Sequence, residues 1–183
     1  MDATLLLVAT VGCDTLRLRD VAASAGVSIG SVQHYFDTRE NLLVEAFEDW
    51  RHRALIRFNP LLQAKGSGLA RLRGILRYLK NEDPGPSTLV WISFCLAATR
   101  IEDVQVRVRD LFQTWHDGLS NALLTSGQWK DLGEAGARQA ASLFMSLHFG
   151  AVLTSTITKG SEIDHQGSTV HSVLSKLLAL SSQ

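Results

Sequence analysis

The sequence predicts an all-α protein, and two observations lead to that prediction. Apolar residues recur at spacings of three and four through most of the 183-residue chain, with almost no alternation typical of a half-buried strand. Clusters of Gly, Pro, Ser and Asp separate the apolar blocks, as in "KGSG" at 65–68 and "DPGPS" at 83–87. The pattern predicts about nine helices, near residues 3–12, 18–24, 28–35, 39–58, 67–82, 87–100, 102–126, 134–158 and 168–181.

The lengths of these helices predict a division of the chain into two parts. The first three helices are short and the later ones are long. We therefore expect residues 1–45 to form a three-helix head and residues 46–183 to form a larger C-terminal helical bundle. The helix beginning near Arg39 joins the two parts.

Composition narrows the class of protein without naming a partner. The 18 basic residues balance the 18 acidic ones, so any contact with nucleic acid must come from a local arrangement of residues. The two cysteines, Cys13 and Cys95, lie far apart in sequence and favour neither a disulfide framework nor a zinc site. The apolar run "LLLVATVGC" lacks the preceding basic residues of a signal peptide. We expect a cytoplasmic protein that binds no membrane, metal or cofactor.

The stretch "VAASAGVSIGSVQHYF", residues 21–36, has the pattern of a helix-turn-helix. Gly26 can adopt the positive φ of a tight turn, and Ser28 can cap the helix that follows. Two short helices can then pack through their apolar side chains, which are Val21, Ala22, Ala25, Val27, Val32 and Phe36.

The second of these helices carries the candidate DNA contacts. In a helix-turn-helix this helix lies in the major groove, where Gln33 can bond to adenine and Ile29 can touch a thymine methyl group. We expect Tyr35 and Arg39 to contact phosphates. The full predicted DNA-binding set is Ser28, Ile29, Ser31, Gln33, His34, Tyr35 and Arg39. A helical hairpin that only packs remains the alternative, because the head has more acidic than basic residues.

The stretch "RLRDVAASAGVSIGSVQHYFDTRENLL", residues 17–43, resembles the DNA-binding head of the TetR family of bacterial transcriptional regulators. Three positions depart from the family pattern: Gln33 replaces a tyrosine, Arg39 replaces a lysine, and Arg17 replaces a capping Ser or Thr. The residues in register are Arg19, Asp20, Val21, Ala22, Ala25, Gly26, Val27, Ser28, Gly30, Val32, Phe36 and Leu42.

The resemblance implies a homodimeric, ligand-responsive regulator. Its default form is a repressor that a small apolar or aromatic effector releases from a palindromic operator. The alternative is a helical protein-interaction module that has lost operator binding. An enzyme is not expected, because the sequence has none of the spacings of a metalloprotease or a Ser-His-Asp site.

The bundle offers candidate residues for an effector pocket and for a dimer interface. Aromatic stripes with a few polar groups favour a pocket formed by Trp91, Phe94, Cys95, Phe112, Trp115, His116, Phe144 and His148. The alternative for each of them is simple core packing. The last two helices have more apolar surface than one bundle needs, which predicts an interface formed by Met145, Phe149, Val152, Val170, Leu174 and Leu177. The alternative is that these residues complete the core of one subunit.

Overall fold

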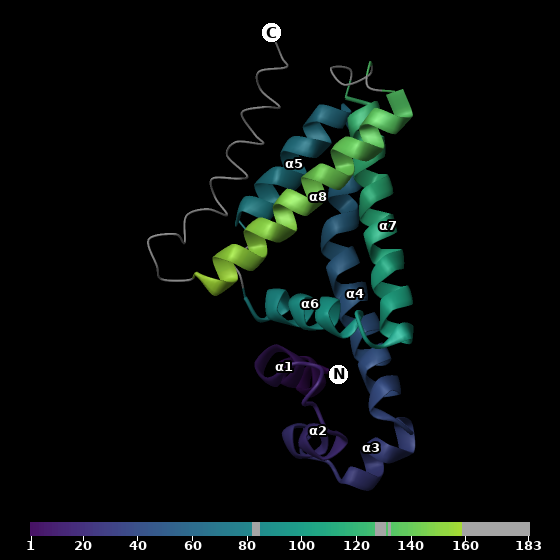
Figure 1. Ribbon diagram of the computed structural model, residues 1–183, viewed down its shortest axis with the longest axis vertical. Coiled ribbons are helices and arrows are strands. Elements are labelled where there is room, and N and C mark those ends of the chain that lie inside the picture. The colour runs from purple at the N-terminus through teal and green to yellow at the C-terminus, as the bar shows by residue number, and fades with distance from the viewer. Residues whose placement is uncertain (82–84, 127–130, 132, 159–183) are drawn as a thin grey trace. The chain divides into compact units, whose positions relative to one another are not determined.

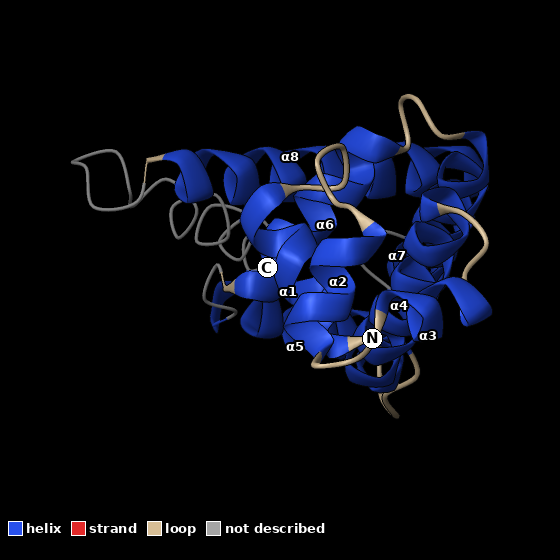
Figure 2. Cartoon of the chain, turned by 90° about the horizontal axis from the view of Figure 1, so that it is seen from below, coloured by secondary structure: helices blue, strands red, loops and turns tan. Residues whose placement is uncertain are grey.

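A computed structural model of the chain describes residues 1–81, 85–126, 131 and 133–158. Within these residues it contains eight α-helices and no strand, which confirms the all-α prediction (Figures 1 and 2). The predicted ninth helix, at 168–181, lies outside the described residues. The helices are α1 (Asp2–Val11), α2 (Leu18–Ala25), α3 (Ile29–Tyr35), α4 (Arg39–Leu62), α5 (Gly68–Asn81), α6 (Pro86–Ala97), α7 (Glu102–Leu124) and α8 (Gly133–Ile157).

Two helix ends differ from the sequence prediction. We expected α4 to end near residue 58, but it continues to Leu62 with Pro60 inside its last turn. Proline removes one backbone donor, so at this position it affects only the end of the helix. Helix α6 ends at Ala97, about one turn earlier than expected.

The chain divides into two compact units that do not coincide with the predicted boundary at residue 45. Unit 1 consists of residues 1–55 and 85–111, and unit 2 of residues 56–84 and 112–183. The three-helix head therefore shares a compact unit with α6. Helices α4 and α7 each contribute residues to both units.

The core of unit 1 joins α1, α4 and α6. The Ser93 hydroxyl of α6 donates to the carbonyl oxygen of Val8 in α1, at 3.1 Å. Phe47 and Phe94 are fully buried and meet edge to face, with ring centroids 5.1 Å apart. An aromatic pair of this kind adds about 1 kcal/mol beyond the burial of its area.

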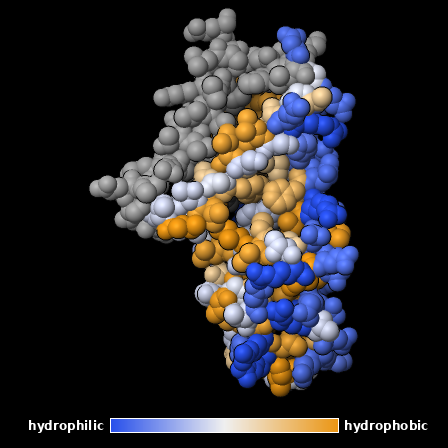
Figure 3. Space-filling view, in the orientation of Figure 1, coloured by the Kyte–Doolittle hydropathy of each residue, from blue (hydrophilic) through white to orange (hydrophobic). Residues whose placement is uncertain are grey.

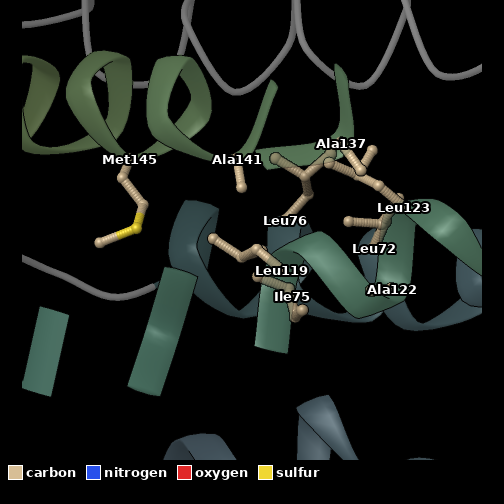
Figure 4. Packing of buried hydrophobic residues seen from close by; sticks show 9 residues of the cluster. All are labelled: Leu72, Ile75, Leu76, Leu119, Ala122, Leu123, Ala137, Ala141 and Met145. Carbon is tan, nitrogen blue, oxygen red and sulfur yellow. The ribbon is translucent and has the colours of Figure 1, made fainter. Parts of the chain in front are cut away.

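The core of unit 2 joins α5, α7 and α8 (Figure 4). Its buried side chains are Leu72, Ile75, Leu76, Leu119, Ala122, Leu123, Ala137, Ala141 and Met145. Helix α5 begins in close contact with the end of α7, because the Gly68 N–H donates to the carbonyl oxygen of Thr125 at 3.2 Å. A Cβ atom at Gly68 would lie 1.9 Å from the Ala122 carbonyl oxygen, so only glycine fits there.

Candidate nucleic-acid interface

The turn between α2 and α3 has the geometry that the sequence predicts. Gly26 ends α2 in the left-handed region, at φ 68° and ψ 28°. The next residue closes the turn, because the Val27 N–H donates to the Ala22 carbonyl oxygen at 3.0 Å. Ser28 then caps α3, with its hydroxyl oxygen accepting the Ser31 N–H at 3.0 Å. These bonds fix where α3 begins.

The packing between α2 and α3 is smaller than predicted. Val21, Ala22 and Val32 are buried, as expected. Ala25 and Val27, which we expected in the same contact, are exposed. Both flank the Gly26 turn, where the chain leaves one helix before the next begins, so their side chains do not enter the contact between the helices.

Most predicted DNA contacts lie on the exposed side of α3. Ile29, Ser31, Gln33 and His34 are exposed, and Tyr35 is 78% exposed. Ser28 is also exposed, but its hydroxyl is engaged with the Ser31 hydroxyl at 2.9 Å and with the Ser31 N–H. The structure therefore gathers polar groups on a short helix whose other side, at Val32, is buried.

Arg39 contacts the backbone between α1 and α2, and its expected contact with a DNA phosphate stays a prediction. Its Nη1 donates to the carbonyl oxygens of Cys13 and Asp14, each at 3.0 Å. Its Nε and Nη2 donate to Glu40 Oε1 at 3.2 and 3.1 Å. Since the guanidinium is hydrogen-bonded to carbonyl oxygens between α1 and α2, a DNA phosphate would compete with these bonds.

Cys13, whose carbonyl Arg39 contacts, is a core residue of the head. Burial, reinforced by the neighbouring Asp14 carboxylate, raises the pKa of the Cys13 thiol to about 12. The thiol is therefore protonated at neutral pH, and it acts as a small apolar side chain.

The structure divides the eight effector-pocket candidates between the two units. Trp91, Phe94 and Cys95 belong to unit 1, where Trp91 stacks on Trp50 and Phe94 packs on Phe47. Burial raises the pKa of the Cys95 thiol to about 12. The contacts of Trp91 and Phe94 are those of a packed core.

The other five candidates belong to unit 2, where an aromatic cluster surrounds Trp115. The ring centroid of Trp115 lies 5.8 Å from Phe58, 6.0 Å from Phe149 and 6.4 Å from Phe112. All four rings are half-buried. Phe58 was absent from the predicted pocket because it lies on α4, far from the others in sequence.

The polar candidates of unit 2 lie along α7 and α8. His116 Nε2 is 3.0 Å from the carbonyl oxygen of Arg138 and 3.1 Å from the hydroxyl of Ser142, so it joins α7 to α8. The ring of His148 lies 5.3 Å from that of Phe149. Phe144 packs against the core of unit 2.

The predicted dimer residues that the structure describes do not share one exposed face. Met145 is part of the core of unit 2, Phe149 packs on Phe112 and Trp115, and Val152 is half-buried. Val170, Leu174 and Leu177 lie outside the described residues.

A different set of apolar residues is exposed on α8, and Figure 3 shows apolar atoms along this helix. Within the described part of the chain, α8 is the helix that has the length and composition to cross a membrane, a property that core helices of soluble proteins share. The exposed residues are Leu143, Leu147, Leu153 and Ile157, which we call the outer face of α8.

Comparison with known proteins agrees with the geometry of the head. Residues 1–46 match the family described as "Bacterial regulatory proteins, tetR family". The chain is 32% identical over 78 residues to the HTH-type transcriptional repressor KstR2 of Mycolicibacterium smegmatis. The aligned stretch covers 40% of this chain and 38% of that repressor.

Two solved structures share the fold over nearly the whole chain. A transcriptional regulator from Rhodococcus sp. Rha1 has a TM-score of 0.78 at 23% identity, covering 98% of this chain and 91% of that one. A regulator from Saccharomonospora viridis, solved in complex with choline, has a TM-score of 0.78 at 18% identity, covering 95% and 92%.

The fold and the exposed α3 define a helix-turn-helix protein with an additional helical region. Its residues 1–46 match the tetR family of bacterial regulatory proteins, and the chain spans less than half the length of the curated repressor that it resembles. This confirms the resemblance seen in the sequence. The family consists of regulators rather than enzymes.

Proposed function

We propose that the chain is a ligand-responsive transcriptional repressor whose helix α3 reads the major groove of an operator. The observation that carries this proposal is the exposed polar side of α3, fixed by the Gly26 turn and the Ser28 cap. Gln33 is placed to bond to adenine, and Ile29 to contact a thymine methyl group. The similarity to a named repressor supports repression as the direction of regulation.

The proposed operator is palindromic because the proposed active form is a homodimer. The outer face of α8 has side chains up to 74% exposed, and a second copy of the chain is its proposed cover. A twofold dimer presents two copies of α3 to half-sites about one DNA turn apart. In the proposed interface, the residues of the outer face of α8 take the place of Met145 and Phe149.

The proposed effector is a small apolar or aromatic molecule that binds at the aromatic cluster of unit 2. Half-buried aromatic rings beside a few polar groups suit such a ligand, and one structural relative was solved with choline. Helices α4 and α7 run through both units, so a ligand that shifts either helix in unit 2 also shifts it in unit 1. Operator binding must then weaken effector binding by the same factor.

The experiment is a selection of duplex DNA by the full chain. Purified protein is mixed with random duplex DNA, and the bound fraction is recovered and sequenced. We expect a palindromic motif, bound with an affinity that falls steeply with salt as counterions are released. If folded protein enriches no motif, the proposal is wrong and the protein-interaction module is favoured.

A pair of variants tests whether α3 is the reading helix. Gln33→Ala should reduce discrimination among selected duplexes, with a loss of about 1–3 kcal/mol at one base position. Gln139→Ala, at an exposed position of α8 in unit 2, is the matched control. Equal motifs for both variants would rule out Gln33 as a base contact.

A further inference from the structure

The surface proposed to bind DNA has few positive charges. Residues 1–46 contain three arginines, six carboxylates and no lysine. DNA binding generally depends on Lys and Arg side chains that neutralise phosphates. The head therefore carries a net negative charge when its histidine is neutral.

The three arginines do not supply a free cation on α3. Arg39 is held by the Cys13 and Asp14 carbonyls and by Glu40. Arg19 pairs with Asp20 at 3.4 Å. Arg17 is exposed and precedes α2, one helix earlier in the chain.

His34 is the residue of α3 that can gain a positive charge. It is exposed and lies in the last turn of the helix, where the helix dipole favours a cation. Its ring meets that of Tyr35 edge to face, at a centroid distance of 5.3 Å, and no carboxylate within the described residues forms an ion pair with it. The charged groups on the neighbouring elements are Arg19 and Asp20 of α2, Asp37 of the following turn, and Arg39 and Glu40 of α4.

We propose that His34 contacts a DNA phosphate in its protonated form, so that DNA binding by this chain takes up a proton. The inference rests on the proposed function, because it assigns a charge to the helix proposed to enter the groove. A phosphate beside the imidazole favours the charged form in the complex. Binding is then strongest at acidic pH, and it weakens as the pH rises and His34 must be protonated at a growing cost.

The test measures DNA affinity against pH with the full chain. The probes are a fluorescein-labelled random duplex and the duplex recovered by the selection, both followed by fluorescence anisotropy. Histidine changes charge between about pH 5 and 8, so the titrations cover that range at constant ionic strength. We expect the Kd to rise up to about tenfold over this range, the limit for one phosphate contact of ordinary strength.

Three variants separate His34 from the other titrating groups. His34→Gln should bind with a Kd near the alkaline value of the wild type at every pH. His34→Arg should keep the tight binding of the acidic wild type throughout the range, because arginine does not lose its proton. His52→Gln, at an exposed position of α4, should retain the wild-type pH dependence.

The outcomes distinguish this inference from the proposed function. DNA binding that is independent of pH, or that depends on pH equally in His34→Gln, overturns the role of His34 and leaves the regulator intact. No binding to either duplex at any pH, by protein shown to be folded by circular dichroism, overturns both.

Discussion

Trp50 of α4 and Trp91 of α6 stack almost in parallel, with ring centroids 5.3 Å apart and ring planes 13° apart. Both side chains are buried, and the Trp50 Nε1–H donates to the Ser87 hydroxyl at 3.1 Å. This stack joins α4, the helix that follows the head, to α6, from which it is separated in sequence by α5. Together with the Ser93–Val8 hydrogen bond and the Phe47–Phe94 contact, it joins α6 to the compact unit that contains the head.

Removal of the Trp91 ring should destabilise unit 1. Trp91→Ala should lower the free energy of unfolding by about 3–5 kcal/mol, because it leaves a cavity beside Trp50. Urea denaturation followed by tryptophan fluorescence measures the change. Leu96→Ala, at an exposed position of the same helix, should cost less than about 1 kcal/mol. Equal costs for the two variants would contradict the packing described here.

Loss of the Arg39 guanidinium should affect folding more than the electrostatics of DNA binding. Arg39→Ala leaves the Cys13 and Asp14 carbonyls without their donor, at a cost of about 1–3 kcal/mol of stability. The stability of Arg39→Lys should lie between those of Arg39→Ala and the wild type, because an ammonium group lacks the planar, forked donors of a guanidinium. Thermal unfolding measures both changes.

The salt dependence of DNA binding provides the control for Arg39. If its role is structural, the slope of log K against log salt should be unchanged in Arg39→Ala at a temperature where the variant is folded. A slope reduced by about one would instead indicate a lost phosphate contact.

The local structure of the head could be predicted because its signals lie within a few residues of one another. Gly26 and Ser28 each act on neighbouring backbone groups, so the turn and the start of α3 follow from sequence. The contacts of Arg39 with the Cys13 and Asp14 carbonyls could not be predicted, because these acceptors lie 26 and 25 residues away. Hydrophobic periodicity does not indicate a hydrogen bond between a side chain and a distant backbone carbonyl.

The partners of α6 and α8 could not be predicted for a different reason. Both helices have apolar residues around most of their circumference, so periodicity does not show which side is buried. On α8 we chose Met145 and Phe149 as exposed, whereas the structure buries Met145 and exposes Leu143 and Leu147. The prediction of α6 as part of the C-terminal bundle missed its contact with α1 for the same reason.

Glycine at position 68 should be essential for unit 2. Gly68→Ala places a Cβ atom against the backbone of α7 and should cost more than about 3 kcal/mol, because backbone cannot move aside as a side chain can. Gly74→Ala on the same helix has no atom within 4 Å of the new Cβ and should stabilise the protein by up to about 1 kcal/mol. Thermal unfolding of the pair should move in opposite directions. A stabilising Gly68→Ala would disprove the close approach of α5 and α7.

A charge on the outer face of α8 should prevent the proposed dimer from forming. Leu147→Asp would bury an unpaired carboxylate between two subunits, so the variant should be monomeric at micromolar concentration. Size-exclusion chromatography with light scattering measures the mass. Val106→Asp, at a similarly exposed position of α7 within unit 1, should leave the mass unchanged. Dimers of Leu147→Asp would place the interface elsewhere.

Unit 1 is composed of two separate stretches, 1–55 and 85–111, which limits how the proposed regulator can be engineered. A chimera that joins residues 1–55 to the sensor of another protein would remove Phe94 and Trp91 from beside Phe47 and Trp50. The transplanted residues 1–55 would then expose an aromatic surface unless the new sensor supplied a helix that packs against it. If α3 reads the operator as proposed, changing its exposed residues is therefore a simpler way to alter operator specificity than transplanting the head.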